Sequence, residues 1–433
     1  MNSYLFEELK MYMKFRLPTF IILMFIGYSL LAQYEDIYFD DYVYVTNIKS
    51  VKINPSGSPL KPPIVYLGNP QRLIVSFDDM DNEVKDYSYD IVHCNKDWTP
   101  SEMERIEYLD GFVDEEVDNS NFSVNTFVPY INYQLPLPNV DVSWNISGNY
   151  ILIIYEGNDE DDRIPVITRR FMVVDKKVGV SIRNRRPLDV TKLRTHFEFD
   201  LFVNNKDFRI IDSRNTISVS VLQNYRWDIA INNLKPKFSV GDKMTIDNTG
   251  KISFPAFKEF RSVDIRSLDY VATGITSIDL NNYGTDVLLD LGKPRGDSYY
   301  TTVPDANGQY VIQNKDMGSS STGGDYANVV FTLAAPEREE EIYVMGAFTD
   351  WKVDEMYRMR YYDNQEVYIA EVLMKQGYYD FFYGIDEGGV LNAREIEGSS
   401  ADTENDYQIL VYLREPADRY DRLIGYYTFN SNR

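Results

Sequence analysis

Short runs of apolar residues, separated by turn-forming residues, recur along the chain after residue 33. The runs are rich in Val, Ile, Tyr and Phe, and Gly, Asn, Asp or Pro interrupts them roughly every 8–15 residues. Apolar positions spaced three and four residues apart, as in an amphipathic helix, are hard to find in this region. The pattern therefore predicts an all-β fold.

The apolar runs have the lengths of strands rather than of helices. The clearest expected strands are Arg72–Phe77, Tyr87–Cys94, Tyr150–Tyr155, Thr168–Val174, Phe197–Val203, Thr216–Leu222, Met244–Ile246, Val329–Leu333, Glu341–Met345, Val367–Met374, Tyr378–Ile385 and Gln408–Leu413.

The length of 433 residues predicts about three domains, because single cores rarely grow beyond ~250–300 residues. One boundary is expected near residues 175–178, where a strand ends in charged residues and a new apolar run begins. A second is expected near residues 314–325, which hold the chain's one Gly/Ser cluster. We therefore expect three consecutive immunoglobulin-like β-sandwich domains at residues 33–176, 177–318 and 325–433.

The first 32 residues have the layout of an export signal. Lys10, Lys14 and Arg16 precede an apolar run of about 15 residues, and Ala32 is a suitable cleavage point. A membrane anchor is the alternative, but the run is shorter than the ~20 residues that a spanning helix needs. The single cysteine, Cys94, leaves an exported chain without an internal disulfide, which favours a bacterial periplasm.

The charge balance excludes one class of partner. The chain has 44 Lys and Arg against 67 Asp and Glu, a formal net charge of −23. Nucleic-acid binding needs a basic surface that releases counterions from phosphates. We therefore expect no nucleic-acid partner.

Residues able to carry out catalysis are scarce, and we expect no enzyme, no metal site and no cofactor. His93 and His196 are the two histidines. His93 and Cys94 are adjacent in an expected strand, so their side chains point to opposite faces and cannot act together. A structural histidine beside a buried thiol is the expectation. The sequence also lacks a nucleophile elbow, a phosphate loop and a zinc-protease motif.

Two acidic clusters are candidates for ion binding, one at residues 78–83 and one at residues 159–162. A calcium loop that began at Asp79 would need glycine at the position of Val84. We therefore expect solvated turns at both clusters. A carboxylate pair for glycoside hydrolysis is a spatial feature, so a hydrolase stays open as an alternative.

The segment from Glu341 to Asp386 contains EIYVMGAFTDW followed by an aromatic strand. This layout resembles the glycogen-binding modules of the early-set immunoglobulin-like class. Of the residues that those modules use to hold sugar, Trp351 matches, whereas Phe382 stands at the lysine position. We therefore expect Trp351 to be a packing residue, and a periplasmic glycan-binding β-sandwich protein is the alternative function.

A longer resemblance covers most of the chain after residue 33. It is carried by four unusual strings, in order YSYDIVHCNKDWTPSEMERIEYLDGF, QNYRWDIAI, FRSVDIRSLDY and TENDYQILVYLREPADRYDRLIGY, at residues 87–112, 223–231, 260–270 and 403–426. The chain is similar to the type IX secretion system plug protein family of Bacteroidetes. The resemblance implies a non-enzymatic periplasmic protein that closes the giant outer-membrane translocon barrel between secretion events, without itself spanning the membrane.

The residues that touch such a barrel are not evident in the sequence. Exposed aromatic residues and arginines are favoured at the centres of interfaces. The run RYDRLIGYY is therefore the expected contact, and an ordinary final strand is the alternative. The expected contact residues are Arg419, Tyr420, Arg422, Tyr426 and Tyr427.

Overall fold

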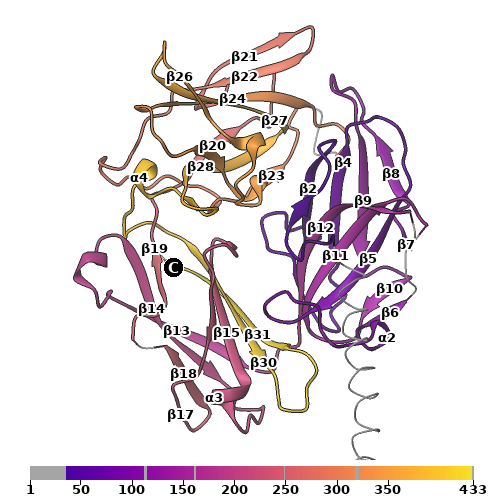
Figure 1. The fold of residues 1–433 in the computed structure, drawn as a ribbon, viewed down its shortest axis with the longest axis vertical. Helices are drawn as coiled ribbons and strands as arrows, with labels where there is room; N and C mark the ends of the chain where they lie inside the picture. The colour runs from indigo at the N-terminus through magenta and orange to yellow at the C-terminus, as the bar shows by residue number, and fades with distance from the viewer. Residues whose placement is uncertain (1–35, 112–114, 160–161, 248, 317–320, 432–433) are drawn as a thin grey trace, which may run out of the picture. The chain divides into compact units, whose positions relative to one another are not determined.

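The computed structural model describes residues 36–431 except 112–114, 160–161, 248 and 317–320. Residues from Asp40 to Arg433 form one compact unit, and Met1–Phe39 form a separate one, of which Asp36–Phe39 are described. The expected export signal, residues 1–32, lies outside the described residues. The regular secondary structure of the compact unit is almost entirely β-strand (Figure 1).

The first sandwich is formed by two main sheets near the N-terminus. The six-stranded sheet contains β1 (Tyr42–Val43), β12 (Ile164–Val174), β11 (Gly148–Glu156), β5 (Tyr87–Cys94) and β7 (Glu115–Glu116), with β3 (Ile64–Tyr66) paired to β12. The four-stranded sheet contains β2 (Ile48–Pro55), β4 (Leu73–Asp79), β9 (Ile131–Leu137) and β8 (Asn119–Phe122). A small extra sheet pairs β6 (Leu109–Gly111) with β10 (Val142–Trp144).

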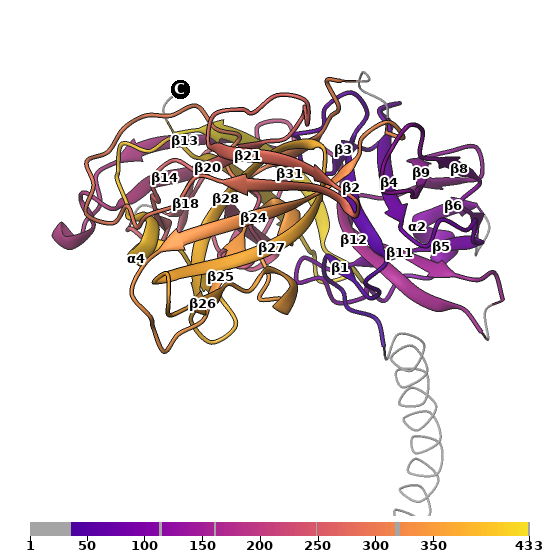
Figure 2. The same ribbon diagram turned by 90° about the horizontal axis from the view of Figure 1, so that it is seen from above.

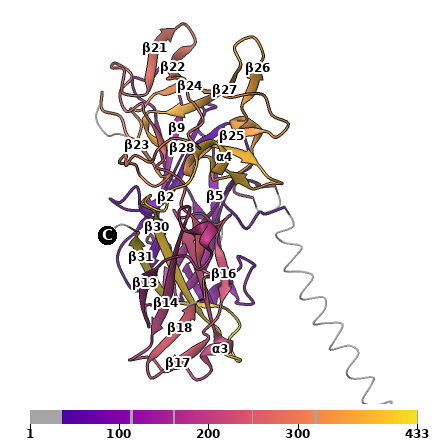
Figure 3. The same cartoon turned by 90° about the vertical axis from the view of Figure 1, so that its left-hand side faces the viewer.

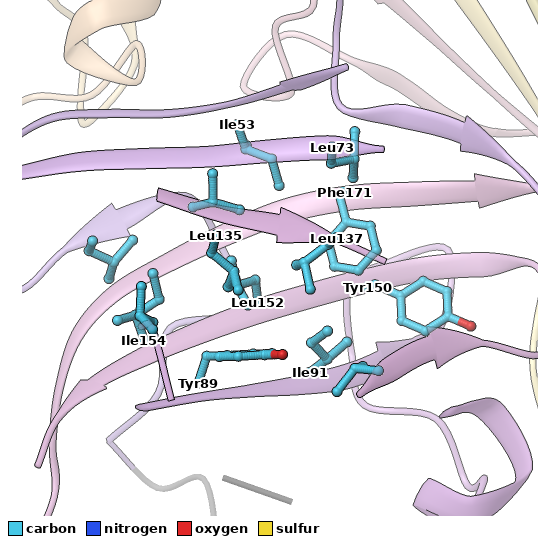
Figure 4. Packing of buried hydrophobic residues seen from close by; sticks show 14 of the residues in the cluster. Ile53, Leu73, Tyr89, Ile91, Leu135, Leu137, Tyr150, Leu152, Ile154 and Phe171 are labelled. Carbon is cyan, nitrogen blue, oxygen red and sulfur yellow. The ribbon is translucent and has the colours of Figure 1, made fainter. Parts of the chain in front are cut away.

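The core of the first sandwich follows from the two-residue period of its strands. In β4, Leu73, Val75 and Phe77 point inward and are fully buried. They pack against the inner face of the other sheet, where Leu152 and Phe171 belong to the same core (Figure 4). The alternate residues of β4, Ile74, Ser76 and Asp78, therefore point out of this core.

The second sandwich joins a five-stranded and a four-stranded sheet. The five-stranded sheet contains β13 (Gly179–Arg185), β14 (His196–Asn204), β18 (Lys243–Asp247) and β17 (Phe238–Val240), with β19 (Ser253–Pro255) paired to β14. The four-stranded sheet contains β16 (Ile231–Leu234), β15 (Ile217–Gln223), β30 (Asp406–Leu413) and β31 (Arg422–Asn430). Buried side chains of both sheets share one core.

The third sandwich stacks two five-stranded sheets, which Figures 1 and 3 show one above the other. The sheet seen from above in Figure 2 contains β21 (Ile275–Asn281), β22 (Gly284–Leu289), β24 (Tyr326–Ala334), β27 (Val367–Lys375) and β26 (Arg360–Tyr362). In the other sheet, β28 (Gly377–Asp386) pairs with β20 (Arg261–Asp264), β23 (Tyr310–Ile312), β25 (Ile342–Met345) and β29 (Leu391–Asn392).

Helices in the described part of the chain are single turns that connect strands. The α-helical turns are α2 (Arg105–Tyr108), α3 (Ser213–Thr216) and α4 (Arg394–Glu397), and the 3₁₀ turns are η1 (Val190–Lys192), η2 (Ala347–Thr349) and η3 (Glu355–Tyr357).

The predicted all-β sandwich architecture is confirmed, and each expected strand overlaps a strand of the structure. The division of the second half into residues 177–318 and 325–433 needs correction. β30, close to the C-terminus, pairs with β15 of the middle segment and with β31, and β20 of the middle segment pairs with β28. The second sandwich is therefore built from two separate parts of the chain, β13–β19 and β30–β31, and the third from the continuous stretch between them, β20–β29, which includes the Gly/Ser cluster that marked the expected boundary.

Candidate functional site

The residues expected to form a partner interface lie on β31 and in the loop before it. Arg419 forms an ion pair with Glu107 of the first sandwich, and its guanidinium also donates to the backbone oxygen of Glu102. The Tyr420 ring meets the His93 ring edge-on, with centroids 5.1 Å apart. These contacts hold the β30–β31 hairpin against the first sandwich.

The other three expected interface residues also have partners within the chain. Arg422 is paired with Asp418 at 3.0 Å, and Gln408 donates a hydrogen bond to the Tyr426 hydroxyl. The rings of Tyr427 and Phe429 stack beside the second core. Contact with another protein through these residues stays a prediction.

His93 and Cys94 have the structural roles that the sequence predicts. The His93 ring is buried among tyrosines, and its Nδ1 lies 2.8 Å from the Ser101 hydroxyl. Burial lowers the pKa of His93 to about 4, so the ring is neutral at physiological pH. Cys94 is fully buried, and burial raises its pKa, which makes the thiol a poor nucleophile.

The acidic cluster at residues 78–83 departs from its predicted role as a solvated turn. Asp78 and Asp79 are fully buried, whereas Asp81 and Glu83 are exposed. The Asp79 carboxylate faces the first core, where it accepts a hydrogen bond of 2.8 Å from the Tyr87 hydroxyl. The prediction was wrong for these two residues because β4 extends through Asp79, which places both carboxylates inside the sheet.

Asp78 points out of the first core and forms the centre of a buried polar contact with the third sandwich. Lys375 Nζ lies 2.7 Å from Asp78 Oδ2, and the Tyr326 hydroxyl donates to the same oxygen at 2.7 Å. Asn132 donates to the other carboxylate oxygen, also at 2.7 Å. Lys375 ends β27 and Tyr326 begins β24, so this contact joins two sandwiches across a sequence separation of almost 300 residues.

Burial governs the ionisation of this pair. The pKa of Asp78 is raised by burial, against the opposing effect of the Lys375 charge and of its hydrogen-bond donors. The pKa of Lys375 is lowered by burial, against the effect of the Asp78 charge. Each charge therefore depends on its partner, because an unpaired charge at this depth costs several kcal/mol.

A second set of contacts between the first and third sandwiches, made of ion pairs, lies near the start of the compact unit. Asp40 lies 2.9 Å from Arg170 of β12 and 3.3 Å from Lys352 of the loop after η2. Arg169, which is almost completely buried, lies 3.3 Å from Asp350. These ion pairs border a cleft of about 590 Å³ that is lined by aromatic and charged side chains, among them Tyr225, Trp227, Tyr310, Trp351, Arg170 and Lys352.

Trp351 is a packing residue, as the sequence predicts. Its side chain is 9% exposed, and the Arg226 guanidinium covers its ring at 4.6 Å from the centroid. Phe382, at the position of the glycan-binding lysine, is fully buried and stacks on Phe260 with centroids 3.8 Å apart. The ring faces that a sugar would need are therefore occupied by the protein itself.

A buried carboxylate makes the stability of the third sandwich depend on pH. Asp380 is fully buried, and its Oδ2 accepts backbone hydrogen bonds from Ala306 and Gly308 at 2.5 and 3.2 Å. A hydrogen bond from the Tyr378 side chain and the backbone hydrogen bonds lower the pKa of this carboxyl, against the larger effect of burial. Burial, helped by the charge of Asp305, raises the pKa of Asp380 from 3.8 to about 7.

We expect Asp380→Asn to stabilise the protein at alkaline pH. The folded chain holds this proton more tightly than the unfolded chain, so the wild type loses stability as pH rises from about 4 to about 7. The neutral amide keeps the acceptor oxygen and removes that loss. Urea unfolding should show a gain of about 1–3 kcal/mol at about pH 8 and almost none at about pH 4.

The control for this measurement is Asp363→Asn, which changes an exposed carboxylate in a turn. That variant should differ from the wild type by less than about 0.5 kcal/mol at both pH values. Equal effects of the two variants at the alkaline pH would contradict the assignment of the raised pKa to Asp380.

The described residues contain neither a cluster of metal-ligating side chains nor a helix suited to crossing a membrane. No group of three or more His, Cys, Asp or Glu side chains in that part of the chain has the geometry to hold a metal ion. Within the same residues, no helix has the length and apolar character needed to cross a membrane.

Comparison with known proteins identifies the family. The model of the type 9 secretion system plug protein first domain matches residues 48–175, which span the first sandwich. The chain belongs to the type 9 secretion system plug protein family. This membership supports a role associated with type 9 secretion and, together with the all-β fold, points to a non-catalytic plug-family protein.

A solved structure extends this similarity beyond the first domain. The crystal structure of a hypothetical protein from Parabacteroides merdae ATCC 43184 is 31% identical, with a TM-score of 0.86. The match covers 92% of this chain and 100% of the Parabacteroides merdae chain. The collagen adhesin of S. aureus covers 89% of this chain and 92% of its own at 8% identity, but its TM-score of 0.11 carries no argument. None of the curated proteins matches the sequence.

Proposed function

We propose that this protein closes the outer-membrane translocon barrel of the type 9 secretion system from the periplasmic side between secretion events. It does so as a rigid body and without chemistry. The family supports the association with secretion. The observation that carries the proposal is the way the three sandwiches are fastened to one another by buried polar contacts.

Rigidity follows from the position of these contacts. The Asp78–Lys375 pair and the ion pairs of Asp40 and Arg169 connect the first sandwich to the third. The second sandwich is connected to the first by the buried hydrogen bond of 2.9 Å from the Tyr412 hydroxyl of β30 to Asn149 of β11 and by the Arg419–Glu107 ion pair. Domains in one chain usually move relative to one another unless large or specific interfaces prevent it. Three sandwiches connected in this way resist movement relative to one another, and a protein that closes a barrel needs such rigidity.

The size of the compact unit is compatible with a wide opening. A barrel of about 36 strands, spaced ~4.8 Å apart and tilted by ~40°, has a backbone diameter of about 70 Å. A compact chain of this length has a radius of gyration of about 21 Å, which corresponds to a diameter of about 55 Å. Side chains and loops narrow such a lumen further, so one chain is large enough to cover most of it.

We also propose that residues 1–32 are removed during export and that the mature chain acts in the periplasm. The apolar run that ends at Ala32 supports this proposal. The proposed site of action is the inner face of the outer membrane, where the barrel would open towards the periplasm.

Deletion of the gene should make the outer membrane permeable while secretion continues. A plug that does no chemistry leaves the translocon able to pass substrates, so the deletion strain should retain part of its secretion. It should also admit large antibiotics such as vancomycin. The measurements are the minimal inhibitory concentration of vancomycin and the amount of secreted substrate.

Two controls define this test. Immunoblotting must show that the barrel is still present, and mass spectrometry of the purified barrel must show no substitute protein in its opening. Complementation with the full chain should restore resistance. Unchanged antibiotic entry under these conditions would overturn the proposed function.

A further inference from the structure

The cleft of about 590 Å³ lies where all three sandwiches meet. The first sandwich contributes Lys52 and Ile53 of β2, and the third contributes Tyr310 of β23, which Figure 1 shows beside β2. The second contributes Tyr225 and Trp227 from the loop between β15 and β16. The volume of the cleft is in the range of ligand pockets, and closure of a barrel gives the cleft no role.

Lys52 lacks an acidic partner within the described residues. Its ammonium group donates a hydrogen bond to the backbone oxygen of Tyr310 and lies 3.9 Å from the centroid of the Tyr310 ring. An ammonium group has three N–H donors, and neither contact supplies a negative charge. Burial lowers the pKa of Lys52 to about 7, and no carboxylate of the described residues opposes this effect. The cleft therefore contains a cation that is partly removed from water and has no counter-ion.

The other charges of the cleft form a balanced network. Asp40 pairs with Arg170 and Lys352, and Arg169 pairs with Asp350. The members of this network are Arg169, Arg170, Lys352, Asp40, Asp41 and Asp350. The remaining aspartate of the lining, Asp228, pairs with Arg226. Among the described residues, Lys52 and the exposed Lys61 are therefore unmatched, which leaves the cleft positive in a chain with a net charge of −23.

The backbone is strained where aromatic side chains surround the cleft. Tyr225 (φ 64°), Trp351 (φ 59°) and Trp98 (φ 67°) adopt the left-handed conformation, and no other described Trp, Tyr or Phe does so. Trp98 lies next to the lining, because its ring meets the Trp227 ring edge-on at 5.1 Å. This conformation is costly for a bulky residue, and such strain gathers at binding sites.

We propose that this cleft binds a peptide segment of a partner protein and that Lys52 pairs with a carboxylate of that segment. The inference goes beyond closure of a barrel and does not depend on it. A carboxylate would occupy the donors of the ammonium group that the chain leaves free and would supply the missing counter-charge. Apolar side chains of the segment would pack on Tyr225, Trp227, Pro62 and Pro63, which line the same cleft.

A carboxylate fits the cleft better than a phosphate group does. A phosphate group carries up to two negative charges, and the aspartates of the balanced network would repel the second. Phosphate sites commonly use the fork of an arginine, whereas Arg169 and Arg170 are held by Asp350 and Asp40. A glycan is also disfavoured, because the Arg226 guanidinium covers the Trp351 ring on which a sugar could stack.

Two synthetic libraries of random octapeptides test the assignment against the purified protein. One library ends in an amide and the other in a free carboxylate, which separates an Asp or Glu side chain from a chain terminus as the source of the charge. Peptides that the protein retains are identified by mass spectrometry. Retained peptides that share an acidic residue, or that come from the free-carboxylate library alone, are the expected result. Retained peptides without a carboxylate, or no retained peptide, would overturn the inference.

A titration with the best peptide tests the role of Lys52. The Lys52→Met variant should bind this peptide at least about tenfold more weakly, because a desolvated charge pair loses one partner. Replacing the acidic group of the peptide with its amide should weaken binding to the wild type equally and have little further effect on the variant. Three of the chain's four tryptophans, Trp98, Trp227 and Trp351, lie in or beside the cleft, so intrinsic fluorescence reports binding.

The matched control is Lys206→Met, which changes an exposed lysine in the turn after β14 and should alter the affinity by less than about twofold. Lys52→Met should keep or raise the urea midpoint, because it removes an unpaired ammonium group. If this variant fails to fold, the amide peptide decides on the wild type alone. Equal affinity of the acidic peptide for Lys52→Met and the wild type, or of the acidic and amide peptides for the wild type, would overturn the inference. Tighter binding of inorganic phosphate or of trigalacturonate than of the peptide would overturn it as well.

Discussion

Replacing Lys375 with methionine should lower the free energy of unfolding by about 3–5 kcal/mol. The substitution leaves the Asp78 carboxylate buried without its cation, 2.7 Å from where the ammonium was. Tyr326 and Asn132 still donate hydrogen bonds to it, but they carry no charge. Urea unfolding followed by tyrosine and tryptophan fluorescence measures the loss.

A double-mutant cycle separates the ion pair from simple packing. Asp78→Asn together with Lys375→Met removes both charges, so the double variant should be more stable than the sum of the single losses predicts. The control is Lys315→Met, which changes a half-exposed lysine 3.9 Å from Asp264. It should cost less than about 1 kcal/mol. A comparable, small loss for Lys375→Met would show that the buried pair does not fasten the sandwiches.

Truncating Phe382 to alanine should also destabilise the protein by about 3–5 kcal/mol. The ring is fully buried and contacts Phe260 and Phe257, so its removal opens a cavity that the strand β28 cannot close. Phe382→Lys, which introduces the residue of the glycan-binding modules, should be worse, because it buries an ammonium group without a partner. The thermal unfolding midpoint and the yield of folded protein are the measurements.

The matched control for Phe382 is Leu373→Ala on the neighbouring sheet. Leu373 is 41% exposed on β27, and its truncation should cost about 1 kcal/mol or less. Phe382→Leu should be intermediate, because it keeps the apolar volume in part. Wild-type stability of Phe382→Lys would mean that the position is open to solvent, and the glycan-binding alternative would then regain support.

The local sequence pattern was sufficient to predict where the strands lie, but not which strands pair with one another. The runs at Tyr87–Cys94 and Tyr378–Ile385 are short and rich in aromatic and other residues of high β propensity, so their strand state follows from neighbouring residues alone. Pairing of β15 with β30 involves residues almost 200 positions apart, and nothing local specifies it. A Gly/Ser cluster marks a connection in the chain, which need not coincide with a boundary between sheets.

The structural roles of His93 and Cys94 were predicted because they depend on strand geometry alone, which places the two side chains on opposite faces of β5. The burial of Asp78 was missed because a distant segment of the chain buries its charge. The acidic run from Asp78 has the composition of a turn, and the partner that makes burial tolerable, Lys375, is about 300 residues further along the chain. The position of Asp78 after the alternating residues Leu73, Val75 and Phe77 was the available signal, because it extends the same strand.

The pairing of β15 with β30 also sets the order in which the molecule can be completed. Residues 217–223 emerge during synthesis long before residues 406–413, and until these arrive one side of β15 has no neighbour on which to close its hydrogen-bond ladder. Closing so long a loop is entropically costly and slow. The second sandwich therefore cannot be completed until the residues of β30 are present. The C-terminal hairpin thus makes completion of this sandwich a late step in the folding of the newly made chain.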